Sequence, residues 1–413
     1  MISQEDNERL TQVKAGTPVG DLLRRYWYPI AAVSELARHP TKFVKVLGEE
    51  LVLFKDAEGK LGLIGAYCPH RRANLVYGMA EDGGLRCAYH GWKFDRAGRC
   101  LEQPFEETVK PGGFKDQIHL VNYLAEELGG LIFAYLGPQP APLVPRWDLL
   151  MEENFWREIG FTLTAANWLQ TVENIMDPVH VEWLHGVFRN YAAERTGNDE
   201  LKRKRVRHQK IGFDLAEYGI IKRRILEGET EESDDWKIGH WLVFPTIQKG
   251  PDMLRFRVPV DETHTAQWYY SVHPFGEGER QTAEEMPLYH MPSPQLDRHG
   301  QPQFQYLNND VDPQDNAIFA SQGAVVDRTK EMLGESDHGV VLYRHLLDNQ
   351  IKLVAAGRDP MNTFRDPAKN VRLDLATESR EAFLTGRMDA AQGMRRRYSQ
   401  RFRSLADSDK PLP

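Results

Sequence analysis

The sequence of 413 residues predicts an α+β protein in two parts, an all-β module followed by an antiparallel sheet that grips a helix. Three observations support this fold class. Short apolar strand patterns with hairpin-turn signals fill the first third of the chain, a proline-rich stretch interrupts them near residue 140, and further strands then surround a helical segment. The length also exceeds that of one ordinary hydrophobic core, which favours two domains.

The first part is expected to begin with a helix. Residues 15–28 carry apolar side chains at helical spacing, including Leu22, Leu23 and Tyr26. The pattern then changes to strands, with hairpin turns at Asp–Gly signals. The expected strands cover residues 43–47, 50–54, 62–64 and 129–137, with turns at 56–59 and 95–98.

The proline-rich residues 138–145 form the expected linker. We therefore divide the chain into an N-terminal helical segment (1–40), an all-β domain (41–145) and a larger domain (146–413). In the larger domain we expect strands at residues 161–165, 213–221, 241–244, 254–260 and 265–272. A helix from Ser336 to Gly357 and a polar helix over 371–405 complete the prediction.

Composition excludes several classes of protein. A net charge of −8 argues against nucleic acid as a partner, because phosphate binding needs a basic surface. The first residues lack the apolar core of a signal peptide, and the apolar stretch at 131–136 is far too short to span a membrane. Only three cysteines are present, so no internal disulfide framework is expected and the chain is assigned to a reducing cytoplasm.

The strongest motif pairs Cys68-Pro-His70 with Cys87-Ala-Tyr-His90-Gly-Trp92. Two thiolates and two imidazoles are the ligands of a Rieske [2Fe–2S] centre, in which two Cys hold one iron and two His hold the other. We call these four residues the Cys/His set. Structural zinc is the alternative, since Cys₂His₂ also suits a tetrahedral Zn²⁺. A zinc finger, however, groups its two Cys together, whereas here each half supplies one Cys and one His.

A second motif places His180 and His185 five residues apart in a segment with helical features. Two His and one carboxylate form the facial triad of non-haem Fe(II) oxygenases. On an ideal α-helix this spacing sets the rings about 140° apart, so the helix must end or distort between them. Gly186 is the expected terminator, and Pro178 suits a first-turn position. A buried helix with two hydrogen-bonded histidines is the alternative.

Together these segments resemble the oxygenase component (α subunit) of Rieske non-haem iron aromatic ring-hydroxylating oxygenases, and within them the phthalate-dioxygenase-like branch. The C-x-H…C-x-x-H-G-W box and the N-x₂-D-x₂-H-x₄-H box are both present, in the family's order. Further similarity covers residues 16–20 and 26–29 near the start and 314–334 near the end. The resemblance implies an all-β Rieske domain, a helix-grip catalytic domain, a [2Fe–2S] cluster and a mononuclear Fe(II).

The resemblance also implies a third iron ligand, an Asp well downstream of the two histidines. Asp315, which follows Gln314, fits the family pattern best. Asp310 and Asp312 remain alternatives, although acidic residues at a helix start also complement the helix dipole. Asp327 is expected to pair with Arg328 or Lys330 at the surface.

Two more residues receive roles from the resemblance. Asp177 is implied to join the iron ligand His180 to a cluster His of a neighbouring subunit, because electrons in this family cross between subunits. Its i, i+3 spacing from His180 agrees with such a contact, although Asp177 is equally an ordinary helix-start residue. Asn174 matches a family position near the iron. Electron transfer of this kind requires a ring, a homotrimer or a hexamer of two stacked trimers.

The implied function is that of a terminal oxygenase, which uses O₂ and electrons from a separate flavin or iron–sulfur reductase to hydroxylate an aromatic carboxylate. Ring dihydroxylation and oxidative O-demethylation both occur in this branch. The chain has no G-x-G-x-x-G after a strand, so it is not expected to bind NAD(P)H itself. The alternatives are an electron-transfer Rieske protein without oxygenase activity and a zinc-stabilised binding protein.

An acidic substrate would need an arginine in its pocket, since guanidinium groups pair strongly with carboxylates. Five arginines lie on or next to predicted strands of the larger domain, and the sequence does not choose among them. They are Arg207, Arg223, Arg224, Arg255 and Arg257.

Overall fold

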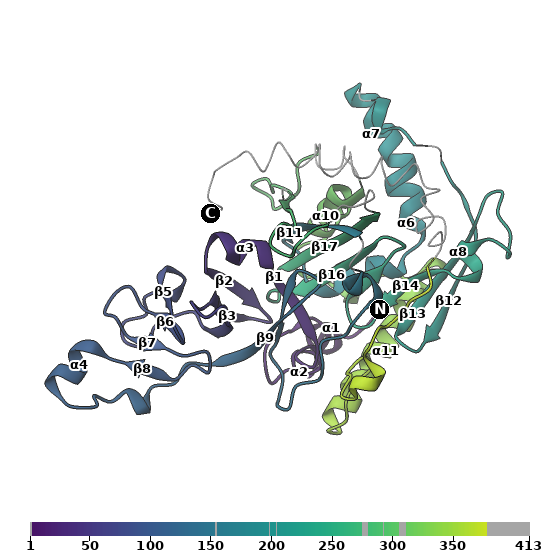
Figure 1. Cartoon of the computed structure of the whole chain (residues 1–413). Helices are drawn as coiled ribbons and strands as arrows, with labels where there is room; N and C mark the ends of the chain where they lie inside the picture. Colours follow the sequence, from purple (N-terminus) through teal and green to yellow (C-terminus); the bar gives the residue numbers. More distant parts are fainter. Residues whose placement is uncertain are drawn as a thin grey trace.

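The computed structural model describes residues 2–377, except 153–154, 198, 204, 275–279, 292 and 305–310. Within this part of the chain, the strands form a six-stranded, a four-stranded and an eight-stranded sheet. Figure 1 shows the first two sheets on one side of the molecule and the eight-stranded sheet with most of the helices on the other. The predicted order, an all-β part followed by an α+β part, is confirmed.

In the N-terminal segment, the helices differ from the single one predicted over residues 15–28. Helix α1 (Gln4–Thr11) is followed by α2 (Pro18–Leu23), whose first turn is capped by the Thr17 side chain. The helix predicted over 15–28 therefore ends early, and β1 (Trp27–Ala32) forms in its place. Pro29 cannot donate the N–H that a continuing helix needs, but it is tolerated in β1, which is an edge strand.

The six-stranded sheet has the order β1-β10-β9-β4-β3-β2 and pairs its strands antiparallel. The hairpin turns at 56–59 and 95–98 form as predicted: Asp56 Oδ1 and Asp95 Oδ1 each accept a backbone N–H four residues on, at 2.8 Å. Besides β1, the six-stranded sheet contains β2 (Thr41–Val46), β3 (Glu49–Lys55), β4 (Leu61–Gly65), β9 (Asn122–Leu128) and β10 (Leu131–Tyr135).

The four-stranded sheet lies at the end of the molecule far from α7 (Figure 1). Helix α4 (Pro104–Val109) directly follows this sheet in the sequence, whereas α3 (Val33–Arg38) follows β1 of the six-stranded sheet. Apolar side chains such as Phe54 and Leu85 form a separate small core beneath it. The strands are β5 (Met79–Glu81), β6 (Gly84–Arg86), β7 (Lys93–Phe94) and β8 (Cys100–Glu102).

The eight-stranded sheet has the order β12-β13-β14-β15-β16-β17-β11-β18, and only the β11–β18 pair is parallel among its described strands. The single strand predicted over 213–221 is wrong, because the chain reverses between β12 and β13. Gly219 permits this turn, since a Cβ there would meet the Leu242 carbonyl oxygen at 2.0 Å. The strands are β11 (Phe155–Thr164), β12 (His208–Ala216), β13 (Gly219–Leu226), β14 (His240–Val243), β15 (Ile247–Lys249), β16 (Met253–Pro259), β17 (Thr265–Pro274) and β18 (Leu288–His290).

The helices of the second part include the predicted one before Gly357, which is α11 (His338–Ala355). Residues 371–377 are not helical, and the rest of the polar helix predicted over 371–405 lies outside the described residues. No helix in the described ranges is both long and apolar enough to cross a membrane. The other helices are α5 (Trp168–Glu173), α6 (Val179–Glu182), α7 (Arg189–Thr196), α8 (Asp234–Lys237) and α10 (Val311–Ser321).

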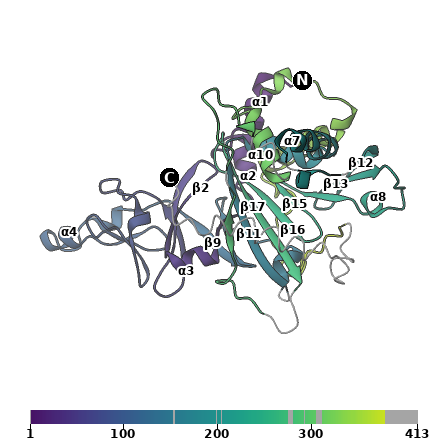
Figure 2. The ribbon, with the colours of Figure 1, turned by 90° about the horizontal axis from the view of Figure 1, so that it is seen from above.

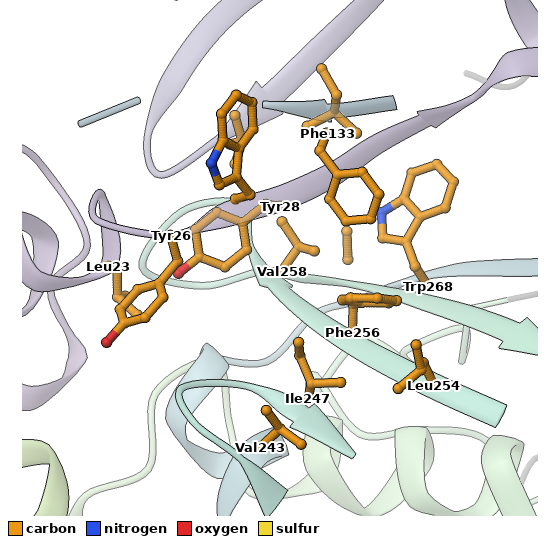
Figure 3. Close-up of a cluster of buried hydrophobic side chains, with 14 of the residues drawn as sticks. Leu23, Tyr26, Tyr28, Phe133, Val243, Ile247, Leu254, Phe256, Val258 and Trp268 are labelled. Carbon is orange, nitrogen blue, oxygen red and sulfur yellow. The ribbon is translucent and has the colours of Figure 1, made fainter. Parts of the chain in front are cut away.

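The two larger sheets share one hydrophobic core. The rings of Phe133 on β10 and Phe256 on β16 meet edge to face, with centroids 5.9 Å apart. Figure 3 shows that both parts of the protein contribute side chains to this core. The first part supplies Leu23, Tyr26, Tyr28 and Phe133, and the second supplies Val243, Ile247, Leu254, Phe256, Val258 and Trp268. Because strand side chains alternate, the opposite face of β16 and β17 is left for polar residues. Helix α10 covers that face (Figures 1 and 2), and Asp312 on α10 pairs there with Arg255 on β16.

Candidate metal centres

The Cys/His set lies on two loops that follow β4 and β6. Each loop is closed by a backbone hydrogen bond to its cysteine: Arg72 N donates to Cys68 O at 2.8 Å, and Gly91 N to Cys87 O at 3.0 Å. Both closing residues have positive φ angles, 60° and 76°, which permit the tight turns. The sequence thus folds each half of the motif into a compact turn.

The cysteines of the set are buried and the histidines lie toward the surface. Cys68 and Cys87 are each 2% exposed, whereas His90 is exposed. Burial raises the pKa of the Cys68 thiol to about 12, so a bound cation must drive formation of the thiolate ligand. His70 Nδ1 is buried without a hydrogen-bond partner, as expected of an atom that ligates a metal.

The spacing of the set does not suit one zinc ion. Tetrahedral Zn²⁺ with bonds of ~2.0–2.3 Å holds its ligand atoms under about 4 Å apart. We searched the described part of the chain for groups of three or more His, Cys, Asp or Glu whose ligand atoms all lie within 4.8 Å of one another. One such group is present, His180, His185 and Asp315, and it contains no residue of the Cys/His set. The Cys/His set therefore spans a wider space, which fits a two-iron cluster. Trp92 supports it by stacking on His70, with ring planes 6° apart.

His180 and His185 are brought together by a change of helix type. Helix α6 continues into a π-helix over Trp183–Phe188 and then into α7. In a π-helix the i→i+5 bond widens the turn, so residues five apart share a face. The two imidazole rings consequently lie with centroids 5.2 Å apart. The predicted distortion is present, but Gly186 does not end the helix, which runs on to Gly197.

Asp315 on α10 completes this second group. Its Oδ1 lies 3.0 Å from His185 Nε2 and 3.9 Å from His180 Nε2. Asp315 Oδ1 and His185 Nε2 are buried, yet neither forms a hydrogen bond of acceptable geometry. Ligand atoms that share one bound cation lie close together and point at the cation, so they do not form a hydrogen bond with each other. The donor set fits iron of the two-His, one-carboxylate type.

Of the two alternative aspartates, Asp312 is engaged elsewhere. Asp312 forms an ion pair with Arg255, with Oδ1 2.7 Å from Nη1. Asp310 lies outside the described residues. Asp327 forms the expected surface ion pair, with Oδ2 2.9 Å from Lys330 Nζ. Geometry therefore favours Asp315 over Asp312.

Hydrogen bonds orient both imidazoles. His185 Nδ1 donates to Gln314 Oε1 at 2.9 Å, which leaves the Nε2 lone pair directed at Asp315. On His180, Nδ1 lies 3.3 Å from Asp177 Oδ2, and Nε2 lies 3.2 Å from Asn174 Nδ2. Asp177 and Asn174 thus both contact His180, from its two ring nitrogens.

The carboxylates of this group are held in their charged form. Burial acts to raise the pKa of Asp315, but the nearby His185 and His180 outweigh it, and the net pKa is below the ordinary value. The same balance applies to Asp177, whose pKa is lowered by His180 and by backbone N–H groups in spite of burial. Both residues therefore offer a negative charge at neutral pH.

Sequence reasoning missed two features of this site. Gln314 was noted only as part of the family pattern, and its role as hydrogen-bond acceptor for His185 depends on a contact across 129 residues. Arg255 was not linked to Asp312 for the same reason. The sequence signal for the contact of Gln314 with His185 is a Gln directly before the proposed ligand Asp. No local signal marks the ion pair between Arg255 and Asp312.

Comparison with known proteins identifies the first domain. Residues 26–112 match the model of the Rieske [2Fe–2S] domain. The chain is 39% identical over 389 residues to the 5,5'-dehydrodivanillate O-demethylase oxygenase subunit of Sphingobium sp., covering 94% of this chain and 89% of that protein. It is 33% identical to the phenoxybenzoate dioxygenase subunit alpha of Ectopseudomonas oleovorans, covering 85% and 86%.

Further similarity extends the comparison. The phthalate 4,5-dioxygenase oxygenase subunit of Pseudomonas putida is 29% identical over 406 residues, covering 88% of this chain and 89% of that protein. Among solved structures, Pseudomonas putida CBB5 NdmA superposes with a TM-score of 0.58 at 18% identity, over 81% of this chain and 92% of that one. Apo dicamba monooxygenase gives 0.53 at 16%, over 81% and 99%. At these identities the structures establish the fold.

The named oxygenase subunits match nearly the whole chain, including the second domain that an electron carrier would not need. The carrier and zinc-binding alternatives are therefore set aside. The chain belongs to the Rieske non-haem iron oxygenases, as an oxygenase component of the phthalate-dioxygenase-like branch that carries a [2Fe–2S] cluster and a mononuclear iron.

Proposed function

We propose that this oxygenase component hydroxylates an aromatic carboxylate, by ring dihydroxylation or by oxidative O-demethylation. The observation that carries the catalytic part is the convergence of His180, His185 and Asp315 on one point, where His185 Nε2 and Asp315 Oδ1 have no hydrogen-bond partner. The substrate class is supported by the relatives' names, which refer to dehydrodivanillate, phenoxybenzoate, phthalate and 3-chlorobenzoate. All four compounds are aromatic acids.

The proposed metal ligands are those expected from the sequence. Cys68, His70, Cys87 and His90 would hold the [2Fe–2S] cluster, and His180, His185 and Asp315 the mononuclear iron. We assign the cluster to residues 41–145, together with β1, which pairs with β10 of the same sheet. Residues 146–413 form the proposed catalytic domain, and the segment before β1 packs against it, with Asn7 Nδ2 donating to Val326 O at 3.0 Å.

When bound, the cluster supplies single electrons and the mononuclear iron binds and activates O₂. The contribution of the chain is to hold these centres in one protonation state and orientation. Gln314 accepts a hydrogen bond from His185 Nδ1 and so keeps the proton on that atom. The Asp177 carboxylate, 3.3 Å from His180 Nδ1, favours a proton there by its charge, so both Nε2 atoms would offer a lone pair. Asn174 places an amide 3.2 Å from His180 Nε2, within reach of a ligand at the iron.

We further propose that electrons enter the iron site from a neighbouring subunit through Asp177. The Asp177 side chain is 32% exposed, so part of its carboxylate remains accessible after it contacts His180. The cluster side is accessible as well, because His90 is exposed beside Tyr89, an aromatic residue that is 56% exposed. Apolar side chains on the surface beside a redox centre favour a protein contact there.

Such a contact is complete only in a closed ring, so we propose a homotrimer or a hexamer of two trimers. A separate flavin or iron–sulfur reductase would reduce the cluster. With Cys68 and Cys87 proposed as cluster ligands, only Cys100 remains, so the chain has no cysteine pair for an internal disulfide, which supports a reducing, cytoplasmic location. Neither nucleic acid nor membrane is proposed as a partner.

Oxygen uptake tests this function. The full-length chain, reconstituted with iron and a surrogate reductase, would be supplied with benzoate, phthalate, vanillate, 3-chlorobenzoate, 3-phenoxybenzoate and 5,5'-dehydrodivanillate. We expect at least one acid to stimulate oxygen uptake and to yield a diol or a phenol with formaldehyde. Preparations with about three iron atoms per chain that show no acid-dependent uptake or product would contradict the proposed substrate class.

A further inference from the structure

Arg257 differs from the other strand arginines of the catalytic domain. It is 2% exposed, and its Nη2 donates a long hydrogen bond of 3.3 Å to the neutral amide oxygen of Gln248. Its Nε and Nη1 are buried without a hydrogen-bond partner. The other four differ from it: Arg207 is exposed, Arg223 pairs with Asp214, Arg224 with Asp235 and Arg255 with Asp312.

The position of Arg257 places its guanidinium on the polar, helix-covered face of the sheet. On β16 the neighbours Phe256 and Val258 point into the apolar core between the sheets (Figure 3), so Arg257 points to the opposite face. Its cross-strand neighbour Gln267 donates a hydrogen bond to Asn316, the residue after Asp315. Arg257 therefore lies on the side of the sheet that holds the proposed iron ligands.

A buried cation of this kind is costly without an anion. Removing a guanidinium from water costs several kcal/mol unless an opposite charge and hydrogen bonds replace the lost hydration. Burial and the nearby Arg255 lower the pKa of Arg257 to about 10, although Asp315 and Asp312 act in the other direction. Those two carboxylates are already committed, Asp312 to Arg255 and Asp315 to the proposed metal site. The charge of Arg257 thus remains available for a ligand.

We propose that Arg257 binds the carboxylate of the aromatic substrate and so fixes the ring beside the mononuclear iron. This inference rests on the proposed function and identifies the residue that recognises the acid. A carboxylate accepts the N–H groups of Arg257 that have no partner in the protein and supplies the missing negative charge. Recognition by a buried guanidinium also explains selectivity, since a neutral analogue would leave the cation unpaired.

The test compares each acid of the panel with its primary amide, which has a similar shape but no charge. Binding would be measured by anaerobic titration calorimetry on the full-length, iron-loaded chain. In the wild type, we expect at least one acid to bind better than its amide. In Arg257→Gln, the affinity for that acid should fall by roughly 30-fold or more, while the affinity for the amide stays nearly constant.

Two further variants make the result specific. Arg223→Gln changes an arginine of the same sheet whose partner is Asp214, and it should retain the preference for the acid. Arg257→Lys keeps the charge and should retain part of it, which separates loss of recognition from loss of folding. Visible spectra and iron content confirm that each variant carries both centres.

The outcomes separate the two proposals. If the wild type prefers no acid over its amide, the proposed substrate class is wrong, and Arg257 has no acid to recognise. If the wild type prefers an acid and Arg257→Gln keeps the same preference, only the assignment of Arg257 fails. Equal loss of acid and amide binding in Arg257→Gln would assign this residue a structural role and would also overturn the inference.

Discussion

Arg255 neutralises Asp312 through an ion pair of 2.7 Å, and this contact distinguishes Asp312 from Asp315 only one helical turn away. Both aspartates lie on α10 and both are buried. Since Asp312 is held by a guanidinium, Asp315 alone of the two can direct a free oxygen at His180 and His185. The ion pair also anchors α10 to β16, which helps to hold Asp315, the proposed third ligand, in position.

This difference leads to opposite expectations for two variants. Asp315→Ala should lose about one iron per chain and all product formation, while the visible spectrum of the cluster is retained. Asp312→Ala should keep the iron but lower the free energy of unfolding by roughly 3 kcal/mol, because Arg255, whose side chain is only 12% exposed, loses the carboxylate of this ion pair. Iron analysis and thermal unfolding measure the two effects. Iron loss in Asp312→Ala but not in Asp315→Ala would reverse the assignment.

The cluster assignment predicts that damage to one centre leaves the other in place. Cys68→Ser should abolish the visible absorbance of the cluster, because a hydroxyl is a poor substitute for a thiolate ligand. The catalytic sheet has its own helices and should keep His180, His185 and Asp315 together, so about one iron per chain should remain. Cys100→Ser is the matched control, since this third thiol lies outside the motif. A normal Rieske spectrum in Cys68→Ser would show that the ligand set is wrong.

Because the helix continues through Gly186, we expect this position to tolerate substitution by alanine. Gly186 has no positive φ, and a Cβ there would lie 3.7 Å from Val181 O, an ordinary contact. Gly186→Ala should therefore keep its iron and gain about 0.5 kcal/mol in the free energy of unfolding. Gly197 ends the helix with a φ of 66°, so Gly197→Ala should lose about 1 kcal/mol. Denaturant titrations compare the two, and the reverse order would restore Gly186 as the helix terminator.

Stability should depend on pH through the contact between the two larger sheets. Lys45 Nζ on β2 lies 2.7 Å from Asp261 Oδ2, just after β16. Burial acts to raise the pKa of Asp261, but the hydrogen bonds from Lys45 and Thr263 outweigh it and hold the pKa well below the ordinary value. A carboxyl whose pKa is lower in the folded state stabilises the protein above its unfolded pKa of ~3.9, and this stabilisation is lost as the pH falls through the folded pKa.

Asp261→Asn should accordingly lower the free energy of unfolding by about 1 kcal/mol at neutral pH, a value that allows for screening by solvent. The difference from the wild type should shrink as the pH falls below about 4. Urea titrations at several pH values measure it. Glu58→Gln, which removes an exposed ion pair with Lys60, is the control and should have a smaller effect. A difference that stays constant down to acid pH would show that Asp261 acts by packing instead of charge.

The sequence predicted those parts of the site that depend on residue type and local spacing. The Cys/His set and the pair His180 and His185 are recognisable because metal ligands are few in kind and fixed in order. The spacing of five also required a distortion, but it did not determine which one, because a helix end and a π-turn satisfy the same condition. The π-helix depends on how α6 and α7 pack, which no local pattern encodes.

Other errors have the same origin. The apolar residues between Phe213 and Ile221 suit a strand, but the chain reverses between Ala216 and its pairing partner Gly219. Gly219 then lies so close to Leu242 O on a neighbouring strand that no side chain fits there. Trp27 fits a helical pattern as well as a strand, and its place in β1 is decided by pairing with Tyr135 more than a hundred residues away. Arg255 and Arg257 were equivalent in sequence. Only their partners across the fold distinguish them.

The proposed route of electrons gives the most specific prediction for a single residue. Asp177 Oδ1 accepts the backbone N–H of Val179 at 2.8 Å, and its other oxygen lies 3.3 Å from His180 Nδ1. Asp177→Asn should preserve the first contact and both metal centres, since Asp177 is not itself a proposed ligand. Electron transfer from the reduced cluster to the iron should slow by orders of magnitude, because the charged link to the neighbouring imidazole is lost.

Single-turnover kinetics of the reduced, substrate-bound protein measure this step, and iron content with the visible spectrum excludes a loss of either centre. Asn174→Ala is the matched comparison, because Asn174 contacts the other ring nitrogen of His180 and should affect the reaction at the iron more than the arrival of electrons. The same route requires that activity depends on assembly. A monomer that is active in analytical ultracentrifugation fractions, or normal electron transfer in Asp177→Asn, would rule out transfer across a subunit boundary through this carboxylate.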